Sequence, residues 1–475
     1  MALADSAPIQ LNELPGPRGL PFLGNLHRIR IERFHLILED WAERFGPLFR
    51  IRMGSHSVAV LSDRSAIQHI LLRRPDAFRR SSVLADVAAE MRLNGVFTAE
   101  GDDWHRQRRM VVAALNRARL GRFFPKLTST VSRLQRRWEC AADSGEAVDV
   151  CGDLMRFTVD VTMQVAFGVD PNTLETSGPV IQHHLDKVFP KLHQRETALV
   201  PYWRYFRLPS DRVLDQALDA LQEEVLNMVS AARARLAAEP WRHDEPEDFL
   251  EAILAELESE GSEFSNAEIF ANAGTLLLAG EDTTANSIAW ITHFFTRYPE
   301  YFERCRMEVD ALVAPEPCIR SFELTHRLPF LDAFANEVMR LKPVAPIHGI
   351  ETLEDVEILD CLIPKGTLIL ALARRMATRD ENFAGGDRFD PDRWLTGPEA
   401  RNGPHDRRAF IPFGGGPRIC PGRNLALLQI RTVVAMLCRN FDLEPDHSSP
   451  DVAERLAFTM MPVNLSLRLK RRDLQ

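Results

Sequence analysis

The chain has 475 residues, of which 45% are hydrophobic, 8% aromatic and 26% charged. This ordinary globular composition excludes a wholly disordered, a collagenous or a disulfide-scaffold protein. Lysine and arginine total 58 against 67 acidic residues, and the formal net charge of -9 argues against a general affinity for nucleic acid or anionic membranes.

The cysteines and the N-terminal residues indicate the cellular setting. Seven cysteines are scattered along the chain without a Cys-x-x-Cys pair, which makes a poor disulfide framework and a poor zinc site. The first twenty residues carry Asp5 and Glu13 and lack an apolar run of signal-peptide length. No stretch approaches the roughly 18 apolar residues that suggest a membrane span. We therefore expect a cytoplasmic protein without a membrane span.

Hydrophobic spacing and the positions of proline and glycine predict the elements in chain order. A proline-rich opening at 14–25 is typical of an extended lead-in, and two short apolar runs at 47–54 and 56–62 predict a β-hairpin. Strands are again expected at 356–364 and 367–373. Between these regions the spacing is mostly helical, most clearly over 64–73, 104–118, 127–141, 211–238 and 248–260. We expect one mainly helical domain over 1–475 with small β-sheets (an α+β fold), whose residues 1–25 form the lead-in, and no fused reductase.

Charge is concentrated in two windows. Ten Arg or Lys residues and no acid lie between 104 and 137, whereas ten acids and no base lie between 244 and 268. Like charges repel unless something neutralises them, so the basic window suggests a site for an acidic partner or cofactor. Solvated helix faces are the alternative.

The segment FGGGPRICPGR presents one cysteine from a glycine-rich loop at the start of a predicted helix. The helix dipole and free N–H groups favour a thiolate, so we predict a low pKa for Cys420 and a role as nucleophile, redox thiol or metal ligand. Gly416 and Gly422 would let the backbone lie against a large planar group. Phe413 would pack beside the sulfur, and Arg418 would pair with a carboxylate. A buried structural cysteine is the alternative.

A second pattern predicts a long helix that would cross a whole domain. Ser265 and Glu268 form a capping-box start, and Pro299 ends the pattern. In its middle, Asp282 and Thr283 follow small residues. A threonine hydroxyl can bond back to a preceding carbonyl and bend the helix, and a carboxylate there can relay protons. A simple kink with a satisfied Asp282 is the alternative.

A third pattern places Glu337 and Arg340 on one helix face at i and i+3. Such pairs are usually weak surface ion pairs. An aromatic-rich turn downstream supplies Arg393, which would complete a buried three-member network with a structural role.

Together these residues resemble the cytochrome P450 family. The segment from Phe413 to Gly422 matches the family's F-x-x-G-x-R-x-C-x-G signature at every fixed position. The resemblance covers essentially the whole chain, with the motifs in the family's order. Asp282 and Thr283 match the family's distal acid-alcohol pair, and Trp104 with Arg108 matches its W-x-x-x-R helix. Glu337 and Arg340 match its E-x-x-R element, and Arg393 matches the partner arginine of that element.

The resemblance implies a haem-thiolate monooxygenase that uses O2 to hydroxylate or epoxidise a hydrophobic small molecule. Cys420 would ligate the iron of haem b. Two electrons from NAD(P)H would arrive through a separate ferredoxin- or flavodoxin-type donor, docked on the basic window that lies partly on the proximal side in the family. The remaining roles implied are proton delivery by Asp282 and Thr283 and contacts to the haem propionates by Trp104, Arg108 and Arg418.

One departure concerns a propionate contact. Many family members carry an arginine shortly before a Glu-Asp pair, here Glu354-Asp355, but this chain has His348 and no arginine in that segment. His348 would either replace the arginine at the propionate or face the substrate.

The positions that line the family's substrate pocket are mainly apolar here, which suggests a terpenoid, steroid or fatty-acyl substrate. Two alternatives are a haem-thiolate isomerase, dehydratase or peroxygenase, and a non-catalytic haem-binding protein; the intact pair of Asp282 and Thr283 argues against both. We expect a monomer. The predicted pocket residues are Val83, Leu84, Val87, Val96, Phe97, Ala279, Ile347 and Met460.

Overall fold

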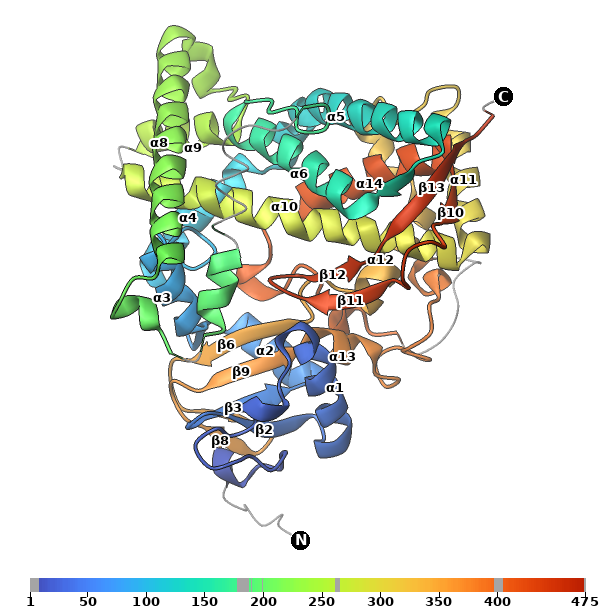
Figure 1. Ribbon diagram of the computed structural model, residues 1–475. Helices are drawn as coiled ribbons and strands as arrows, with labels where there is room; N and C mark the ends of the chain where they lie inside the picture. The colour runs from blue at the N-terminus through green and yellow to red at the C-terminus, as the bar shows by residue number, and fades with distance from the viewer. Residues whose placement is uncertain are drawn as a thin grey trace.

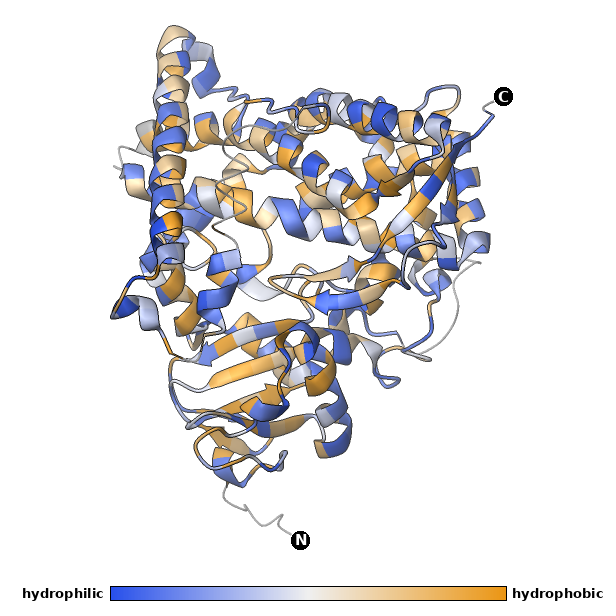
Figure 2. Cartoon of the chain, viewed as in Figure 1, coloured by the Kyte–Doolittle hydropathy of each residue, from blue (hydrophilic) through white to orange (hydrophobic). Residues whose placement is uncertain are grey.

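The structure is a computed structural model that describes residues 8–176, 188, 190–198, 200–260, 265–396 and 405–473. Helices make up the larger part of the molecule, and the largest sheet lies below them near the N-terminus (Figure 1). The predicted mainly helical fold with small sheets is therefore confirmed. Apolar residues concentrate on the inner strands of that sheet, β9 above all, and on the helix faces that meet in the body (Figure 2).

The helices are α1 (Phe34–Phe45), α2 (Arg64–Leu72), α3 (Ser82–Glu90), α4 (Gly101–Ala114), α5 (Arg117–Ser144), α6 (Val150–Phe167), α8 (Pro209–Ala238), α9 (Phe249–Glu260), α10 (Asn266–Arg297), α11 (Pro299–Val313), α12 (Pro329–Leu341), α13 (Ala373–Thr378) and α14 (Arg423–Asn440). The strands are β1 (Ile9–Gln10), β2 (Leu48–Met53), β3 (His56–Leu61), β4 (Phe78–Arg80), β5 (Ala147–Asp149), β6 (Ile347–Thr352), β7 (Val356–Ile358), β8 (Cys361–Ile363), β9 (Leu368–Leu372), β10 (Phe441–Pro445), β11 (Ala453–Leu456), β12 (Met460–Val463) and β13 (Ser466–Arg471).

Helix α10 is the long helix that the sequence predicts, and it crosses the body of the molecule (Figure 1). Ser265 caps its N-terminus, where the Ser265 hydroxyl accepts from the backbone of Glu268 and the Glu268 carboxylate accepts from the backbone of Ser265. Most of its residues from Ile269 to Phe295 are buried, because α6 and α14 pack against it. Burial on nearly all sides explains why its sequence is apolar around most of its circumference.

The largest sheet has the strand order β2-β3-β9-β6-β4, with β3 and β9 parallel and the other neighbours antiparallel. The predicted hairpin is the pair β2 and β3. The prediction of one strand at 356–364 is wrong, since β7 and β8 form a hairpin there. Leu359 and Asp360 form its turn with φ of 49° and 58°, a left-handed pair that matches the twist of a two-residue hairpin.

Helix α5 begins ten residues earlier than the pattern at 127–141 predicts and runs through Pro125. A proline inside a helix removes one hydrogen bond and usually ends the helix. Here the turns on both sides of it bury apolar side chains, among them Phe123, Phe124 and Leu127. Tertiary packing therefore outweighs the local cost.

Many basic residues of the first charged window form ion pairs with acids of the second window or of other segments. Arg122 of α5 pairs with Glu245 at 3.3 Å, and Arg106 of α4 pairs with Glu268 at the start of α10. At least six of the ten basic residues have a carboxylate partner among the described residues: Arg106, Arg117, Arg122, Arg133, Arg136 and Arg137. The basic window is therefore not one open face for an acidic partner, because acids far away in the sequence occupy much of it.

In the residues that the structure describes, no helix is both long and apolar enough to cross a bilayer.

Candidate active site

The loop before α14 is folded into a tight turn that presents Cys420. The backbone N–H of Cys420 donates to the Phe413 carbonyl at 2.9 Å, which closes the loop, and Gly414 and Gly416 take φ of 72° and 65°. A Cβ on Gly416 would lie 2.0 Å from the Leu71 carbonyl oxygen of α2. Gly416 is thus required by the contact with α2 rather than by a planar group, whereas a Cβ on Gly422 would lie 3.8 Å from the Cys420 sulfur.

The thiol of Cys420 is accessible although protein atoms surround it. Its side chain is exposed, yet desolvation raises its pKa above the ordinary value. The backbone N–H groups of Gly422 and Arg423 and the charge of Arg108 act in the opposite direction but do not prevail. The predicted low pKa is therefore wrong for the protein by itself. A metal cation bound to the sulfur would reverse this balance, since a coordinating thiol loses its proton outright.

The middle of α10 is accessible on one face only. Among the mostly buried residues in the middle of α10, Ala279 is exposed, and Leu276, Gly280, Asp282 and Thr283 are partly exposed. Residues three and four apart share a helix face, so these residues form one accessible side of this turn. The predicted acid-alcohol pair thus lies where a bound molecule would reach it.

Thr283 is hydrogen-bonded within α10, and the carboxyl of Asp282 is desolvated. The Thr283 hydroxyl donates to the Ala279 carbonyl at 2.7 Å, the back-bond that the sequence suggests. Desolvation raises the pKa of Asp282 above the ordinary value for a carboxyl. On the side of α10 facing α6, the Cα of Gly280 approaches Thr162, whose hydroxyl would lie 2.7 Å from a Cβ.

Buried arginines gather beside the Cys420 loop. Arg418 lies with its guanidinium 4.6 Å from the ring centre of Trp104, donates to the Ala99 carbonyl at 2.7 Å, and pairs with Glu100. Its side chain is only 2% exposed, and its Nε and Nη1 find no acceptor among the described residues. Arg108 of α4 is near enough to act electrostatically on both Cys420 and Arg418. The structure therefore brings the predicted residues Trp104, Arg108 and Arg418 together near the thiol.

Two further arginines that no motif predicts belong to this group. Arg74, after α2, is 6% exposed, and its Nε and Nη2 also lack an acceptor in the described part of the chain. Arg80, at the end of β4, donates from Nε to the Phe97 carbonyl at 2.8 Å. Burial and the charges of Arg74 and Arg418 lower its pKa to about 9. We refer to Arg74, Arg80, Arg108 and Arg418 as the open arginine cluster.

His348 of β6 lies within reach of that cluster. Burial, with the charges of Arg74 and Arg80, lowers its pKa to about 4, so the ring is neutral near pH 7. Side chains alternate along a strand, and its neighbour Ile347 accordingly packs on the apolar cluster around α1 on the other face of the sheet. Ile347 and His348 therefore cannot both face the same ligand.

Glu337 and Arg340 form the predicted buried network. Arg340 donates to both carboxylate oxygens of Glu337 at 2.8 Å, and Arg393 donates to Oε1 at 3.0 Å. The backbone carbonyls of Ala377 and Arg388 accept further bonds from Arg340, and both members of the central pair are fully buried. We call Glu337, Arg340 and Arg393 the closed arginine cluster, because protein acceptors bind its guanidinium donors.

The predicted pocket residues are not all brought together. Val83 of α3 is 51% exposed on the outer surface, whereas Leu84 and Val87 are buried in the main core. Met460 is fully buried, and its carbonyl accepts from the Trp290 indole at 3.3 Å. The partly accessible residues that remain are Val96, Phe97 and Ala279.

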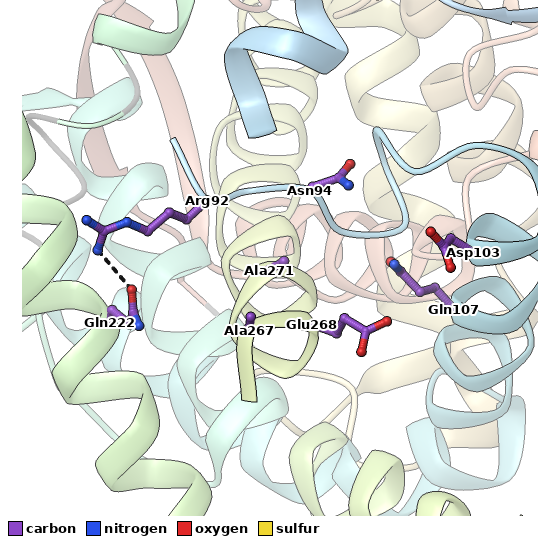
Figure 3. A pocket seen from close by; sticks show the side chains of 8 residues that line it. All are labelled: Arg92, Asn94, Asp103, Gln107, Gln222, Ala267, Glu268 and Ala271. Atoms are coloured by element: carbon purple, nitrogen blue, oxygen red, sulfur yellow. Dashed lines mark hydrogen bonds between the residues drawn. The ribbon is translucent and has the colours of Figure 1, made fainter. Parts of the chain in front are cut away.

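A cleft of about 510 Å³ opens outside this region, between α4, α8, the start of α10 and the loop after α3 (Figure 3). At one edge of the cleft, Arg92 donates to the Gln222 side chain at 2.9 Å. Asp103, Gln107 and Glu268 also line it. Because most of these side chains are polar or charged, the cleft does not match the apolar cavity that the sequence predicts.

Comparisons with known proteins identify the family of this chain. Residues 14–469 match the family profile described as Cytochrome P450. The human protein named 25-hydroxyvitamin D-1 alpha hydroxylase, mitochondrial, is 27% identical over 479 residues, which cover 96% of this chain and 92% of that one. Cytochrome P450 4d10 of Drosophila mettleri is 25% identical over 489 residues, covering 97% and 92%.

A solved structure agrees with these relatives. The heme domain of cytochrome P450DA superposes with a TM-score of 0.86 at 20% sequence identity, covering 98% of this chain and 99% of that one. The predicted resemblance is confirmed: this chain belongs to the cytochrome P450 family, whose members are haem-thiolate monooxygenases that receive electrons from redox partners.

Proposed function

We propose that the protein binds haem b through Cys420 and inserts one oxygen atom of O2 into a hydrophobic small molecule. The observation that carries this proposal is the accessible Cys420 thiol near the buried Arg74 and Arg418, which each have two nitrogens without an acceptor among the described residues, because this donor set would fit a large cofactor with a thiolate ligand and two carboxylates. When bound, a haem with a thiolate ligand supplies O2 activation and oxygen transfer. Arg108, Arg418 and the Trp104 indole would hold the propionates, and Phe413 and Gly422 would flank the sulfur.

Asp282 and Thr283 would move protons on the distal side. The Thr283 hydroxyl is committed as a donor to the Ala279 carbonyl, so its oxygen remains an acceptor for a water or for a protonated carboxyl. The raised pKa of Asp282 keeps it protonated to higher pH than an ordinary carboxyl, as a proton donor requires. This pair favours monooxygenation over the isomerase, dehydratase and peroxygenase alternatives, which have less need of a proton relay.

The substrate would be a terpenoid, steroid or fatty-acyl molecule. Val96, Phe97 and Ala279 supply the apolar, partly accessible side chains next to the distal face of α10. The backbone of Val96 is fixed to this helix by a 2.9 Å bond to the Asn272 side chain, which would keep the loop in place around a ligand.

Electrons from NAD(P)H would arrive through a separate ferredoxin- or flavodoxin-type protein, with the chain acting as a single-domain monomer. Leu72, which is 65% exposed, lies at the end of α2 that contacts Gly416 of the Cys420 loop. Val112 of α4 is 46% exposed, and the exposed Arg109 and Arg117 are near it in the sequence. Exposed apolar side chains with basic neighbours suit an acidic electron-transfer protein.

The spectrum of the reduced protein with carbon monoxide tests the proposal. We expect the red-shifted Soret band of a thiolate-ligated haem in the wild type and its loss in Cys420→Ala. The matched control is Cys140→Ala, which changes an exposed cysteine on α5 and should leave the band unchanged. An unshifted band in the wild type, or one that survives in Cys420→Ala, would show that Cys420 is not the ligand.

A further inference from the structure

The hairpin of β11 and β12 packs beside α10 without belonging to a larger sheet. In the described part of the chain its two strands pair only with each other, and a two-stranded hairpin is at best marginally stable by itself. The hairpin lies below α10 in the view of Figure 1, and β12 contacts this helix. Contacts of the hairpin with the rest of the protein must therefore hold it in place.

The turn of this hairpin meets α10 where the accessible side of the helix ends. Ala279, Thr283 and Asn286 are separated by four and three residues, so they share one helix face. Ala279 is exposed and Thr283 is partly exposed, whereas Asn286 is only 1% exposed. The Asn286 side-chain amide donates to the Thr459 hydroxyl of the hairpin turn at 3.0 Å. A ligand that extends along this face beyond Thr283 would therefore meet the hairpin turn.

One carboxylate of β11 joins the hairpin to three helices. Glu454 lies 3.2 Å from Nε2 of His35 on α1 and accepts from Lys342, directly after α12, at 2.5 Å. Arg374 of α13 donates to both Glu454 oxygens, at 3.1 and 3.2 Å. The other side of the Arg374 guanidinium donates to Glu39 of α1 at 2.7 and 2.9 Å. Glu454 thus fixes β11 to groups that are themselves held by the helical body.

The same network reaches the second strand of the hairpin. Nη1 of Arg374 lies 3.5 Å from the sulfur of Met460, whose backbone N–H donates to the Val344 carbonyl at 2.8 Å. Burial acts to raise the pKa of Glu454, but the hydrogen bond from His35 and the charges of Arg374 and Lys342 hold this pKa well below its ordinary value. The carboxylate therefore stays charged, and its removal would leave buried donors unpaired.

We propose that Glu454 is a positioning residue that sets the selectivity for bulky ligands. By fixing the hairpin to α1, α12 and α13, it holds the turn at Thr459 against Asn286 and so limits how far a ligand extends beyond Thr283. Glu454 acts through the hairpin and not by touching the ligand, since protein donors occupy its carboxylate. This inference rests on the proposed function, because it requires a ligand held between haem and α10.

Two ligands of the haem iron that differ in size test the proposal: imidazole, and 4-phenylimidazole, which adds a phenyl ring. Their Kd values are measured by spectral titration of the haem-loaded protein. In Glu454→Gln, the Kd of 4-phenylimidazole should rise about three- to tenfold, because a displaced turn loses apolar contact with the ring, and that of imidazole should not change. Arg455→Gln, at the exposed neighbour on β11, is the matched control and should bind both ligands as the wild type does.

The ratio of the two Kd values separates positioning from a merely structural role, since a general loosening would affect both ligands alike. An unchanged ratio in Glu454→Gln, or an equal rise of both constants, would overturn the proposal. If this variant gives no folded protein, Lys342→Met removes one donor and should raise the ratio about twofold, and an unchanged ratio there has the same meaning. A wild type whose spectrum does not respond to imidazole would instead contradict the proposed function.

Discussion

Two clusters of buried arginines in this protein differ in how completely they are hydrogen-bonded. In the closed arginine cluster, Glu337 accepts from Arg340 and Arg393, and backbone carbonyls satisfy the outer nitrogens of Arg340. In the open arginine cluster, Arg74 and Arg418 leave nitrogens with no acceptor in the described residues. Both clusters contain buried arginines, so burial alone does not distinguish a structural site from a binding site.

The difference indicates what each cluster is for. A buried ion pair with complete hydrogen bonding fixes the parts of the chain that supply its members, here α12 and the turn around Arg393. Buried donors that the protein leaves unpaired are costly unless a ligand completes them. The closed cluster therefore stabilises the fold, whereas the open cluster is organised for an anion.

The largest effect is expected when the closed cluster is broken. Glu337→Gln would leave two buried guanidiniums without their carboxylate and should lower the free energy of unfolding by about 3–5 kcal/mol. Urea denaturation of the haem-loaded protein, followed by circular dichroism, measures the change.

Glu300→Gln, an exposed acid on α11, is the control and should change stability by no more than about 0.5 kcal/mol. If Glu337→Gln gives no folded protein, Arg393→Met removes a single donor from the same carboxylate and should be destabilising but soluble. Stability equal to that of the wild type in both variants would contradict the structural role.

Two threonines of helix α10 differ in the same way, since one has an accessible side chain and the other is buried. Thr283 and Thr292 each donate to the carbonyl four residues earlier, at 2.7 and 2.9 Å, but Thr283 borders accessible space whereas Thr292 is 1% exposed. Thr283→Val should lower the product formed per electron pair consumed by roughly three- to tenfold, because a positioned proton-transfer group is lost while water substitutes in part.

Thr292→Val removes an equivalent back-bond from the same helix and should leave this coupling unchanged. Product and consumed NAD(P)H are measured together under steady-state turnover. If both variants uncoupled equally, the effect would belong to the helix and not to the Thr283 hydroxyl.

The smallest effect is expected at the exposed arginines Arg109 and Arg117. Arg117 pairs with Glu323 at 3.3 Å, with both side chains more than half exposed, so this pair adds little stability. Arg109→Glu with Arg117→Glu should slow reduction by a ferredoxin-type donor by about two- to fivefold at low salt, and the difference should vanish at high salt. Arg44→Glu on α1 is the control, and a reduction rate of the double variant equal to that of the wild type at low salt would exclude docking on this surface.

Elements that depend on interactions between residues close in the sequence were predictable, whereas those that depend on distant contacts were not. The ends of α10, the hairpin of β2 and β3 and the cysteine loop depend on capping, turn and spacing signals within a few residues, and each was predictable. The two strands inside 356–364 were merged because their turn, Leu359 and Asp360, lacks the glycine that usually marks one. The start of α5 was misplaced because packing around Pro125 outweighs its local preference.

By itself, the sequence determined the family, and it singled out the thiol and the acid-alcohol pair to which we assign the chemistry, because these are short motifs defined by residue type and spacing. Only the tertiary structure decided that Arg74 and Arg80 join Arg418, that the basic window is largely paired with distant acids, and that burial raises the pKa of Cys420. The physical reason is common to all three. Desolvation and charge pairing depend on which segments meet in space, and the register of β4 against β6 brings together residues 268 positions apart, Arg80 and His348.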